Sequence, residues 1–353
     1  MRSLALLTSG GDAPGMNAAL VAATKVAVAA GVQVLGVRDG YDGLIDGHFE
    51  ILTPARVDDW SHRGGTEIGS ARSERFRMPE GRATAAIALR AVGAEGLLVI
   101  GGNGSLTGAR ALSRETGIAV VGLPASIDHD LACTNAAIGV DTALNTIVSA
   151  CDRISDTARS HRRAFIVEVM GRQCGYLAMA SAIAANADAV LFREQGKGED
   201  QLVLELSGLL RRCFAAGREK KRVLVLKAEG VEVPTERLVA RLSPQLAVDA
   251  PGASLRYVVL GHVVRGGAPS FRDRLVAQRL AHAGVRALLD GHTEVMAGWE
   301  WPGEGGTATM DPSVRLFGLD RVLHETDALL AGTHPVTRRR VQLLEQVQGV
   351  LAL

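Results

Sequence analysis

The sequence predicts an α/β protein built from two doubly wound lobes with parallel sheets. Short apolar runs that end in glycine-rich turns alternate with segments of helical periodicity, which is the pattern of strand–helix–strand units. The chain has 353 residues, more than one hydrophobic core usually serves. A hydrophobic content of 47% and 41 glycines suit a fold with many strand-to-helix turns.

The first elements are predicted from apolar runs between glycines. Residues 4–7 and 32–37 are predicted as strands, with an alanine- and valine-rich helix at 17–29 between them. This order predicts a parallel sheet with crossover helices. The other elements expected in this part are a turn at 39–43, a loop-rich segment at 54–83 with a short helix near 57–60, a helix at 84–92, and strands at 97–100 and 119–122.

The pattern restarts after residue 130. Residues 141–156 have apolar positions at helical spacing, which predicts a helix. Acidic and hydroxyl residues suit its first turn. Residues 298–309 are rich in glycine, tryptophan and acidic residues, and we expect them to form an exposed loop. The remaining expected elements are strands at 165–169, 189–192, 223–226 and 257–261, and helices ending near 185 and spanning 201–216, 271–289 and 336–353.

Ligands of doubly wound sheets bind outside the carboxyl ends of the strands. The unusual polar clusters of this chain follow predicted strands, so we expect them to share one cleft between two Rossmann-like lobes. The expected boundaries assign residues 1–139 and about 262–310 to one lobe. Residues 140–261 and about 311–353 would form the other lobe.

Composition and charge exclude several classes of protein. A formal net charge of +1 argues against bulk binding to nucleic acid. The four cysteines show no CxxC spacing and suggest free thiols of a reduced cytosol. The N-terminus shows no signal peptide, and Lys25 interrupts the longest apolar stretch before it could span a bilayer. We therefore expect a cytoplasmic protein that binds neither nucleic acid nor membrane.

Three glycine-rich segments, at 10–12, 64–72 and 101–105, follow or precede predicted strands. Glycine lets backbone N–H groups approach an anion, and Arg72 within the second segment can bind phosphate with two parallel N–H groups. Neither GxxxxGK[ST] nor GxGxxG spacing is present, which argues against a P-loop and a dinucleotide site. Alone, the first segment could equally be an ordinary tight turn, and the second would be favoured as a solvated basic loop.

Two carboxylates, Asp128 and Asp130, follow the predicted strand at 119–122. One carboxylate can accept a hydroxyl proton while the other helps to hold a metal, although turn or capping roles are the common alternative. His129 between them is expected to point away from the site. A scattered basic set would suit a sugar phosphate, or would form surface salt bridges: Arg163, Arg172, Arg256, His262 and Arg265.

In order and spacing these strings resemble the ATP-dependent 6-phosphofructokinase family of the bacterial type, over nearly the whole chain. The pieces that carry the resemblance are LTSGGDAPGMN at 7–17, GGT at 64–66, GSAR at 69–72, GGNGS at 101–105, SID at 126–128, EVMGR at 168–172, AEG at 228–230 and LGHVVRGG at 260–267.

The resemblance implies phosphoryl transfer from ATP to the C1 hydroxyl of fructose 6-phosphate, with Asp128 as general base. Arg72 and Arg172 would offset charge on the transferred phosphoryl group. The implied nucleotide-binding residues, in the lobe that starts at residue 1, are Gly11, Tyr41, Arg72, Ser73, Arg77, Gly102, Asn103, Gly104 and Ser105. The other lobe is expected to be the sugar-phosphate-binding lobe. The residues implied to bind the sugar phosphate are Ser126, Ile127, Asp128, Arg163, Met170, Gly171, Arg172, Glu229, Arg256, His262 and Arg265.

Arg163 and Arg256 match positions that reach into a neighbouring subunit's site, so the resemblance implies a homotetramer or homodimer with shared active sites. Gly104 and Ala125 stand where pyrophosphate-using relatives carry aspartate and lysine, which favours ATP. Asn103 replaces the aspartate that helps to hold Mg²⁺. Asn103 keeps an oxygen ligand but loses its charge, so we expect weaker Mg²⁺ binding, with Asp130 and the ATP phosphates still recruiting the ion.

Three alternatives stay open at this point. The acceptor could be another sugar phosphate such as sedoheptulose 7-phosphate, the donor could be pyrophosphate, or Asn103 could mark an inactive binding protein. The effector site of bacterial relatives has also changed, because Val21, Pro54 and Ser155 stand where arginines are expected. Although Lys25, Arg218 and Lys220 remain, we expect little control by ADP or phosphoenolpyruvate.

Overall fold

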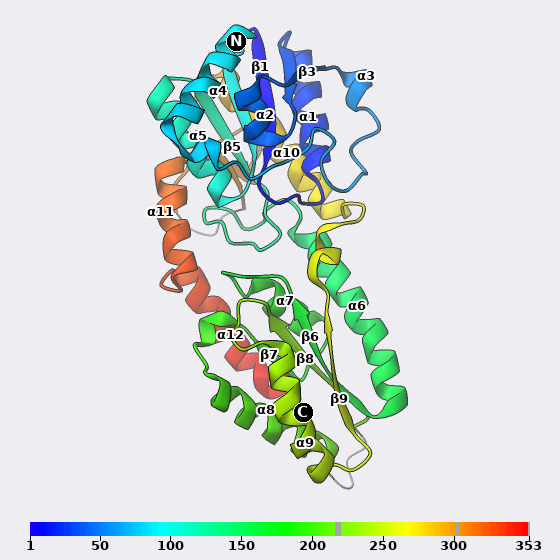
Figure 1. Cartoon of the computed structure of the whole chain (residues 1–353). Helices are drawn as coiled ribbons and strands as arrows, with labels where there is room; N and C mark the ends of the chain where they lie inside the picture. Colours follow the sequence, from blue (N-terminus) through cyan, green and yellow to red (C-terminus); the bar gives the residue numbers. More distant parts are fainter. Residues whose placement is uncertain (216–219, 301–303, 352–353) are drawn as a thin grey trace. The chain divides into compact units, whose positions relative to one another are not determined.

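The computed structural model describes residues 1–215, 220–300 and 304–351 (Figure 1). The chain divides into two compact units. The first comprises Met1–Thr142 and Arg265–Leu329, and the second comprises Ala143–Val264 and Leu330–Leu353. Residues 311–329, expected in the second lobe, therefore belong to the first. The reason is strand pairing, because β12 (Val314–Gly318) lies antiparallel to β10 (Val295–Trp299) in the first sheet.

The first unit contains an eight-stranded sheet in the order β11-β12-β10-β5-β4-β1-β2-β3. Its centre is parallel, as predicted, and the antiparallel strands β3, β11 and β12 lie toward its two edges. The strands not yet given are β1 (Ser3–Ser9), β2 (Gln33–Val37), β3 (Phe49–Leu52), β4 (Gly96–Gly101), β5 (Ala119–Pro124) and β11 (Thr307–Ala308).

Helices cover both faces of this sheet, which confirms the doubly wound α/β class for the first unit. α1 (Met16–Ala29) and α10 (Phe271–Leu289) pack together on one face, where Gly284 lets α10 come close to Leu98 and Leu123. On the other face, alternate strand residues such as Leu7 and Val99 form a core with the remaining helices. These are α2 (Gly40–Asp46), α4 (Pro79–Ala91), α5 (Asn103–Thr116) and α11 (Leu319–Leu330).

The second unit contains a four-stranded parallel sheet in the order β7-β8-β6-β9. Its core joins strand residues such as Ile166 and Val225 to the apolar faces of α8 (Glu199–Phe214) and α9 (Thr235–Asp249). The strands are β6 (Arg163–Val169), β7 (Ala189–Leu191), β8 (Arg222–Ala228) and β9 (Ser254–Val259), and the other helices are α6 (Val140–His161), α7 (Tyr176–Ala184) and α12 (Pro335–Leu351). Two short 3-10 helices follow strands: η2 (Arg193–Gln195) and η3 (Gly261–Arg265).

The start of α6 is capped from far away in the sequence. The buried Asp273 of α10 accepts hydrogen bonds from the backbone N–H groups of Gly139, at 2.9 Å, and Thr142, at 2.7 Å. From the sequence, we expected only acidic and hydroxyl residues of the helix's own first turn to stabilise this start. The structure adds a carboxylate 131 residues away from Thr142, which satisfies N–H groups that a helix leaves free at its start.

Several local predictions were wrong. Residues 39–43 are not a simple turn but lead into α2, and the segment at 54–83 holds α3 (Pro54–Val57), η1 (Arg75–Arg77) and the start of α4. The expected loop at 298–309 contains the end of β10 and the strand β11, with residues 301–303 outside the described part. Across the described ranges, no helix combines the length and the apolar character needed to cross a membrane.

Candidate active site

Three parallel strands of the first unit end side by side. Ser9 at the end of β1 lies opposite Gly101 in β4, and Gly101 lies opposite Pro124 in β5. A Cβ atom on Gly101 would stand 2.7 Å from the carbonyl oxygen of Ser9, so only glycine lets these backbones approach. The loop after β1, the turn before α5 and the loop with Asp128 therefore start from one edge of the sheet.

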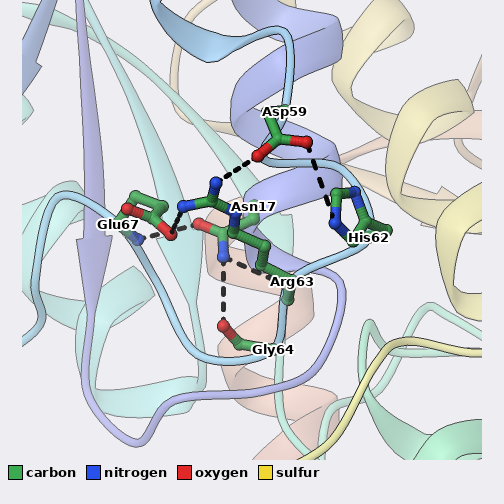
Figure 2. A network of polar contacts seen from close by, with 6 residues as sticks. All are labelled: Asn17, Asp59, His62, Arg63, Gly64 and Glu67. Carbon is green, nitrogen blue, oxygen red and sulfur yellow. Dashed lines mark hydrogen bonds and ion pairs between the residues drawn. The ribbon is translucent and has the colours of Figure 1, made fainter.

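Asn17 fastens the second glycine-rich segment to this edge (Figure 2). Its side-chain amide donates to the carbonyl oxygens of Arg63 and Gly64, both at 3.2 Å, and its carbonyl oxygen accepts from the backbone N–H of Glu67 at 2.8 Å. Asn17 is completely buried. Sequence reasoning gave this residue no role, although its neighbours in the motif were identified.

Further hydrogen bonds hold the same segment against the end of β1. The Thr8 hydroxyl donates to the carbonyl oxygen of Gly69 at 2.7 Å, and the Ser70 hydroxyl donates to that of Gly10 at 2.8 Å. The predicted glycine clusters at 10–12 and 64–72 are thus one assembly. This contact brings backbone N–H groups of two loops to the same place, as a phosphate site requires.

Arg265 lies directly over the first glycine turn. A Cβ atom on Gly11 would stand 2.8 Å from Nη1 of Arg265, which donates to the carbonyl oxygen of Asp12 at 3.2 Å. A Cβ atom on Gly64 would overlap the carbonyl oxygen of Gly267. A guanidinium group and three glycine backbones therefore converge in the first unit, an arrangement suited to an anion.

The turn before α5 is open at one position. A side chain at Gly104 would meet no atom within 4 Å, whereas Gly102 faces Ala125 and Ser126. Asn103 is half-buried in the first turn of α5, and Ser105 is buried. This turn offers the free N–H groups of a helix start to a phosphate.

Tyr41 supports this turn from behind. Its hydroxyl donates to the carbonyl oxygen of Ser105 at 2.7 Å, and its ring stacks on Phe76 with 3.7 Å between ring centroids. Only 4% of Tyr41 is exposed, and this burial raises the pKa of its hydroxyl far above the ordinary value. The structure therefore gives Tyr41 a positioning role in the turn.

The side chains of the other predicted nucleotide-binding residues differ in how many contacts they make within the chain. The Ser73 hydroxyl contacts Asp42 and accepts from the backbone N–H of Phe76 at 3.1 Å, so it shapes the start of η1. Arg77 is exposed and pairs with Glu74 at 2.9 Å. Arg72 is exposed and forms no hydrogen bond or ion pair with any residue in the described ranges, so its guanidinium is available to a ligand.

The two carboxylates after β5 have different surroundings. Asp130 accepts a hydrogen bond from the Ser126 hydroxyl at 2.7 Å, and Asp128 is half-buried between the fully buried Ile127 and His129. His129 is 1% exposed and has a positive φ of 51°, so it is an interior residue and not a surface ligand.

In the second unit, three predicted sugar-phosphate segments also lie together at strand ends. The Glu229 N–H donates to the Val169 carbonyl oxygen at 2.9 Å, and the Leu260 N–H donates to that of Glu168 at 3.0 Å. A Cβ atom on Gly230 would overlap the carbonyl oxygen of Arg172. The loops after β6, β8 and β9 are therefore in direct contact.

The side chains on these loops are mostly free. Met170 and Gly171 are buried, whereas three polar side chains are exposed and have no hydrogen-bond or ion-pair partner within the described ranges. These are Arg172, Glu229 and His262. A cation, a carboxylate and an imidazole that are not used by the fold can bind the phosphate and hydroxyl groups of a sugar phosphate.

Arg163 and Arg256 lie at the opposite end of the second sheet from these loops. Arg163 is the first residue of β6, and Arg256 pairs with Phe165 near the same amino end of the sheet. At about 3.3 Å per residue, the length of β6 separates Arg163 from Val169 by about 20 Å. Within one chain, they do not join the loop that carries Arg172.

Sequence reasoning also missed a buried ion pair beneath these loops. Nζ of Lys227 in β8 lies 3.1 Å from Oε2 of Glu168 in β6, and the Thr235 hydroxyl donates to the same oxygen. Lys227 is 1% exposed. The signal was present as one lysine and one glutamate in otherwise apolar strands, but only the strand register shows that they face each other.

Comparison with known proteins decides the family. Residues 3–288 match the family model described as phosphofructokinase. The chain belongs to the phosphofructokinase family. It is 40% identical over 304 residues to an ATP-dependent 6-phosphofructokinase of Halothermothrix orenii, covering 85% of this chain and 90% of the relative. It is 44% identical over 298 residues to one of Thermotoga neapolitana, covering 84% and 89%.

Solved phosphofructokinase structures share the fold. Phosphofructokinase from Saccharomyces cerevisiae superposes with a TM-score of 0.81 at 31% identity, covering 98% of this chain and 48% of the yeast chain, so this chain spans about half of the yeast length. A pyrophosphate-dependent phosphofructokinase from Marinobacter aquaeolei gives a TM-score of 0.74 at 19% identity, covering 91% of this chain and 84% of its own, which shows the fold alone.

Phosphoryl transfer in an ATP-dependent phosphofructokinase needs a divalent cation. Asn103 in the first turn of α5 and Asp130 after β5 carry side-chain oxygen atoms, the ligand type that a hard cation prefers. Among the residues described, no three His, Cys, Asp or Glu side chains gather as a metal site. Such a sparse set suits an ion that keeps water and substrate phosphates among its ligands.

Three of the positions that the resemblance matches to an effector site form contacts within the chain. Ser155 accepts a hydrogen bond from Arg222 at 2.7 Å, and Lys220 pairs with Asp188. Lys25 pairs with Asp58 at 3.0 Å, and Arg218 lies outside the described residues. The expected loss of control by ADP or phosphoenolpyruvate stays a prediction.

Proposed function

We propose that the chain transfers the γ-phosphoryl group of ATP to the C1 hydroxyl of fructose 6-phosphate, as a glycolytic ATP-dependent 6-phosphofructokinase. The observation that carries the proposal is the assembly of glycine turns and Arg265 at the ends of β1 and β4, in a chain 40–44% identical to enzymes of that name. The products are fructose 1,6-bisphosphate and ADP.

The proposed base is Asp128. It accepts the C1 hydroxyl proton while the C1 oxygen bonds to the γ-phosphorus and the bond from that phosphorus to the β–γ bridging oxygen breaks. Arg72 and Arg172 offset the charge on the transferred group, for which their unpaired, exposed guanidinium groups are suited. Asp128 is half-buried in the turn that follows β5, directly after the buried Ile127.

The proposed nucleotide site uses backbone N–H groups of Gly11 and of the turn formed by Gly102, Asn103, Gly104 and Ser105. Tyr41 holds this turn in place, while Ser73 and Arg77 belong to the neighbouring segment. A bound Mg²⁺ would neutralise charge on the β- and γ-phosphates, with Asn103 and Asp130 as its protein ligands. The open space at Gly104 and the small Ala125 support ATP as the donor.

A further set of residues is proposed to bind fructose 6-phosphate. The phosphate and hydroxyl groups bind to Ser126, Ile127, Met170, Gly171, Arg172, Glu229, His262 and Arg265. Arg163 and Arg256 lie at the far end of the second sheet, which supports their use by a second copy in a homodimer or homotetramer. We also propose a cytoplasmic location, because all four cysteines are buried free thiols.

The experiment measures phosphoryl transfer with fructose 6-phosphate or sedoheptulose 7-phosphate as acceptor, each with ATP or pyrophosphate, in Mg²⁺. Fructose 6-phosphate with ATP should give the highest kcat/KM. Asp128→Asn should lower kcat by about 10²–10⁴-fold, the usual contribution of a general base. Asp130→Asn is the matched control, which should change the Mg²⁺ requirement more than kcat at saturating Mg²⁺.

Other outcomes would identify the alternatives. Higher kcat/KM with sedoheptulose 7-phosphate or with pyrophosphate would overturn the acceptor or the donor. Full turnover by Asp128→Asn would refute the assignment of the base. Absence of turnover with every pair, together with measurable binding of a sugar phosphate, would indicate a binding protein.

A further inference from the structure

The second unit contains a cavity of about 550 Å³ that the proposed reaction does not use. One wall comes from the loop after β6 and from η2, with Gln173, Arg193 and Glu194. The other wall comes from the corner between α11 and α12, with Arg338 and Gln342. This volume lies within the range of small-molecule sites.

The cavity lining is suited to an anion. Arg193 and Arg338 are exposed, and neither guanidinium forms an ion pair with any residue in the described part of the chain. The first turn of the 17-residue helix α12 contributes Thr337 and Arg338 to the same wall. Two unpaired arginines can bind one phosphate from two sides, each with parallel N–H groups.

Glu194 is the carboxylate among the lining residues. Its Oε1 accepts a hydrogen bond from the backbone N–H of Gly175 at 2.8 Å, and its Oε2 is buried without a hydrogen-bond partner among the described residues. A buried acceptor without a donor is costly, and a rotation of the Glu194 carboxyl group would let a ligand hydroxyl satisfy it. Gln173 and Gln342 add amide groups that can bind further hydroxyls.

We propose that this cavity binds a small phosphorylated metabolite that carries hydroxyl groups, a sugar phosphate or a nucleotide. Arg193 and Arg338 take the phosphate, and Glu194 with the two glutamines takes the hydroxyls. The residues from the α11–α12 corner lie beyond position 288, where the match to the family model ends. The site therefore depends partly on residues outside the range that matches the family model.

The cavity is coupled to the loop of the proposed sugar-phosphate site. Gln173 directly follows Arg172, and Glu194 holds the N–H of Gly175 at the other end of the same loop. A ligand that contacts Gln173 and Glu194 restrains the loop from Met170 to Gly175. Occupancy should change the KM for fructose 6-phosphate more than kcat, a consequence that rests on the proposed function.

Direct binding is the first test and does not depend on turnover. Isothermal titration of the full-length protein uses glycerol 3-phosphate, AMP and inorganic phosphate as probes, with fructose 6-phosphate and a non-hydrolysable ATP analogue saturating the proposed active site. At least one hydroxylated probe should bind at least tenfold more tightly than inorganic phosphate. The better of glycerol 3-phosphate and AMP distinguishes a sugar phosphate from a nucleotide.

Variants then locate the site. Arg193→Gln and Arg338→Gln should each weaken this binding tenfold or more, whereas Arg339→Gln is the matched control, because Arg339 is an exposed neighbour on α12 that does not line the cavity. The proposal is overturned if no probe binds, if inorganic phosphate binds as tightly as the others, or if Arg339→Gln has the same effect. Binding with an unchanged KM would refute the coupling alone.

Discussion

Replacing Glu168 by glutamine should destabilise the second unit more than replacing its partner Lys227 by methionine. Glu168→Gln leaves the Lys227 ammonium group, which is 1% exposed, without its counter-charge. Breaking a buried ion pair from one side usually costs about 3–5 kcal/mol. The strands β6 and β8 that carry the pair are neighbours in the sheet, so the loss acts on the centre of this unit.

Lys227→Met should cost less, about 1–2 kcal/mol, because the remaining Glu168 side chain is 20% exposed and still accepts from Thr235. Methionine also fills the apolar space of the lysine stem. The double variant Glu168→Gln with Lys227→Met removes both charges and should lie within about 1 kcal/mol of the original chain. The two single costs sum to more than the cost of the double variant, so the pair is predicted to show a coupling energy of about 3–8 kcal/mol in a double-mutant cycle.

Hydrogen exchange followed by mass spectrometry measures the stability of the second unit by itself, without assuming that the two units unfold together. A loss of about 3 kcal/mol should speed exchange of the β8 amides roughly 10²-fold, since about 1.4 kcal/mol is a factor of ten. Peptides from β1 and β4 in the first unit are the internal control. Equal exchange in Glu168→Gln and the original chain, or a larger effect of Lys227→Met, would refute the reasoning.

Three further predictions concern the first unit. Asp273→Asn should cost about 1–3 kcal/mol, seen as a lower Tm than for the exposed control Asp290→Asn, because an amide cannot accept every hydrogen bond at the start of α6. Burial raises the pKa of the Cys133 thiol from 9.0 to about 12. Alkylation of Cys133 at pH 8 should therefore be slow, and stability should fall more steeply between pH 9 and 12 than in Cys133→Ala, which lacks the thiol. Asn103→Asp should raise turnover at low Mg²⁺ several-fold, and an unchanged Mg²⁺ titration would contradict this account of the metal ligands.

The central strands could be predicted from sequence because the pattern that identifies each strand lies within its own residues. Strands of a parallel sheet are buried on both faces, so β1 contains the apolar run at residues 4–7, and β4 is an apolar run that ends in Gly101. The helix α10 was predicted with its observed limits, because its apolar spacing is regular and Ser270 caps its start.

The missed elements depend on partners elsewhere in the chain. Gly40 and Gly43 suggested a turn, yet Gly43 is required because a side chain there would overlap the carbonyl oxygen of Arg38, and the chain continues as α2. The strand β3 has four residues, of which only Leu52 is buried, and its state is decided by pairing with β2. Local propensity does not contain that information.

In the candidate site, too, the residues recognisable from local sequence were predicted and those with distant partners were missed. Glycine turns and Asp128 were found from residue type and spacing, since a phosphate cradle needs glycine wherever it occurs. Asn17 and Lys227 were missed because their roles lie in bonds to Gly64 and Glu168, which are far from them in sequence. The separation of Arg163 from Arg172 is a matter of which end of β6 each occupies, and only the strand limits reveal it.

The discontinuous first unit also has a consequence for synthesis on the ribosome. Its sheet is complete only after β12, whereas all four strands of the second sheet lie between Arg163 and Val259. The close approach of the Gly64 and Gly267 backbones can form only after residue 267 has been synthesised. The sheet that starts at the N-terminus is therefore completed last. In the interval the edge of β5 that later receives β10 has no strand beside it, and an unpaired strand edge makes a nascent chain prone to associate.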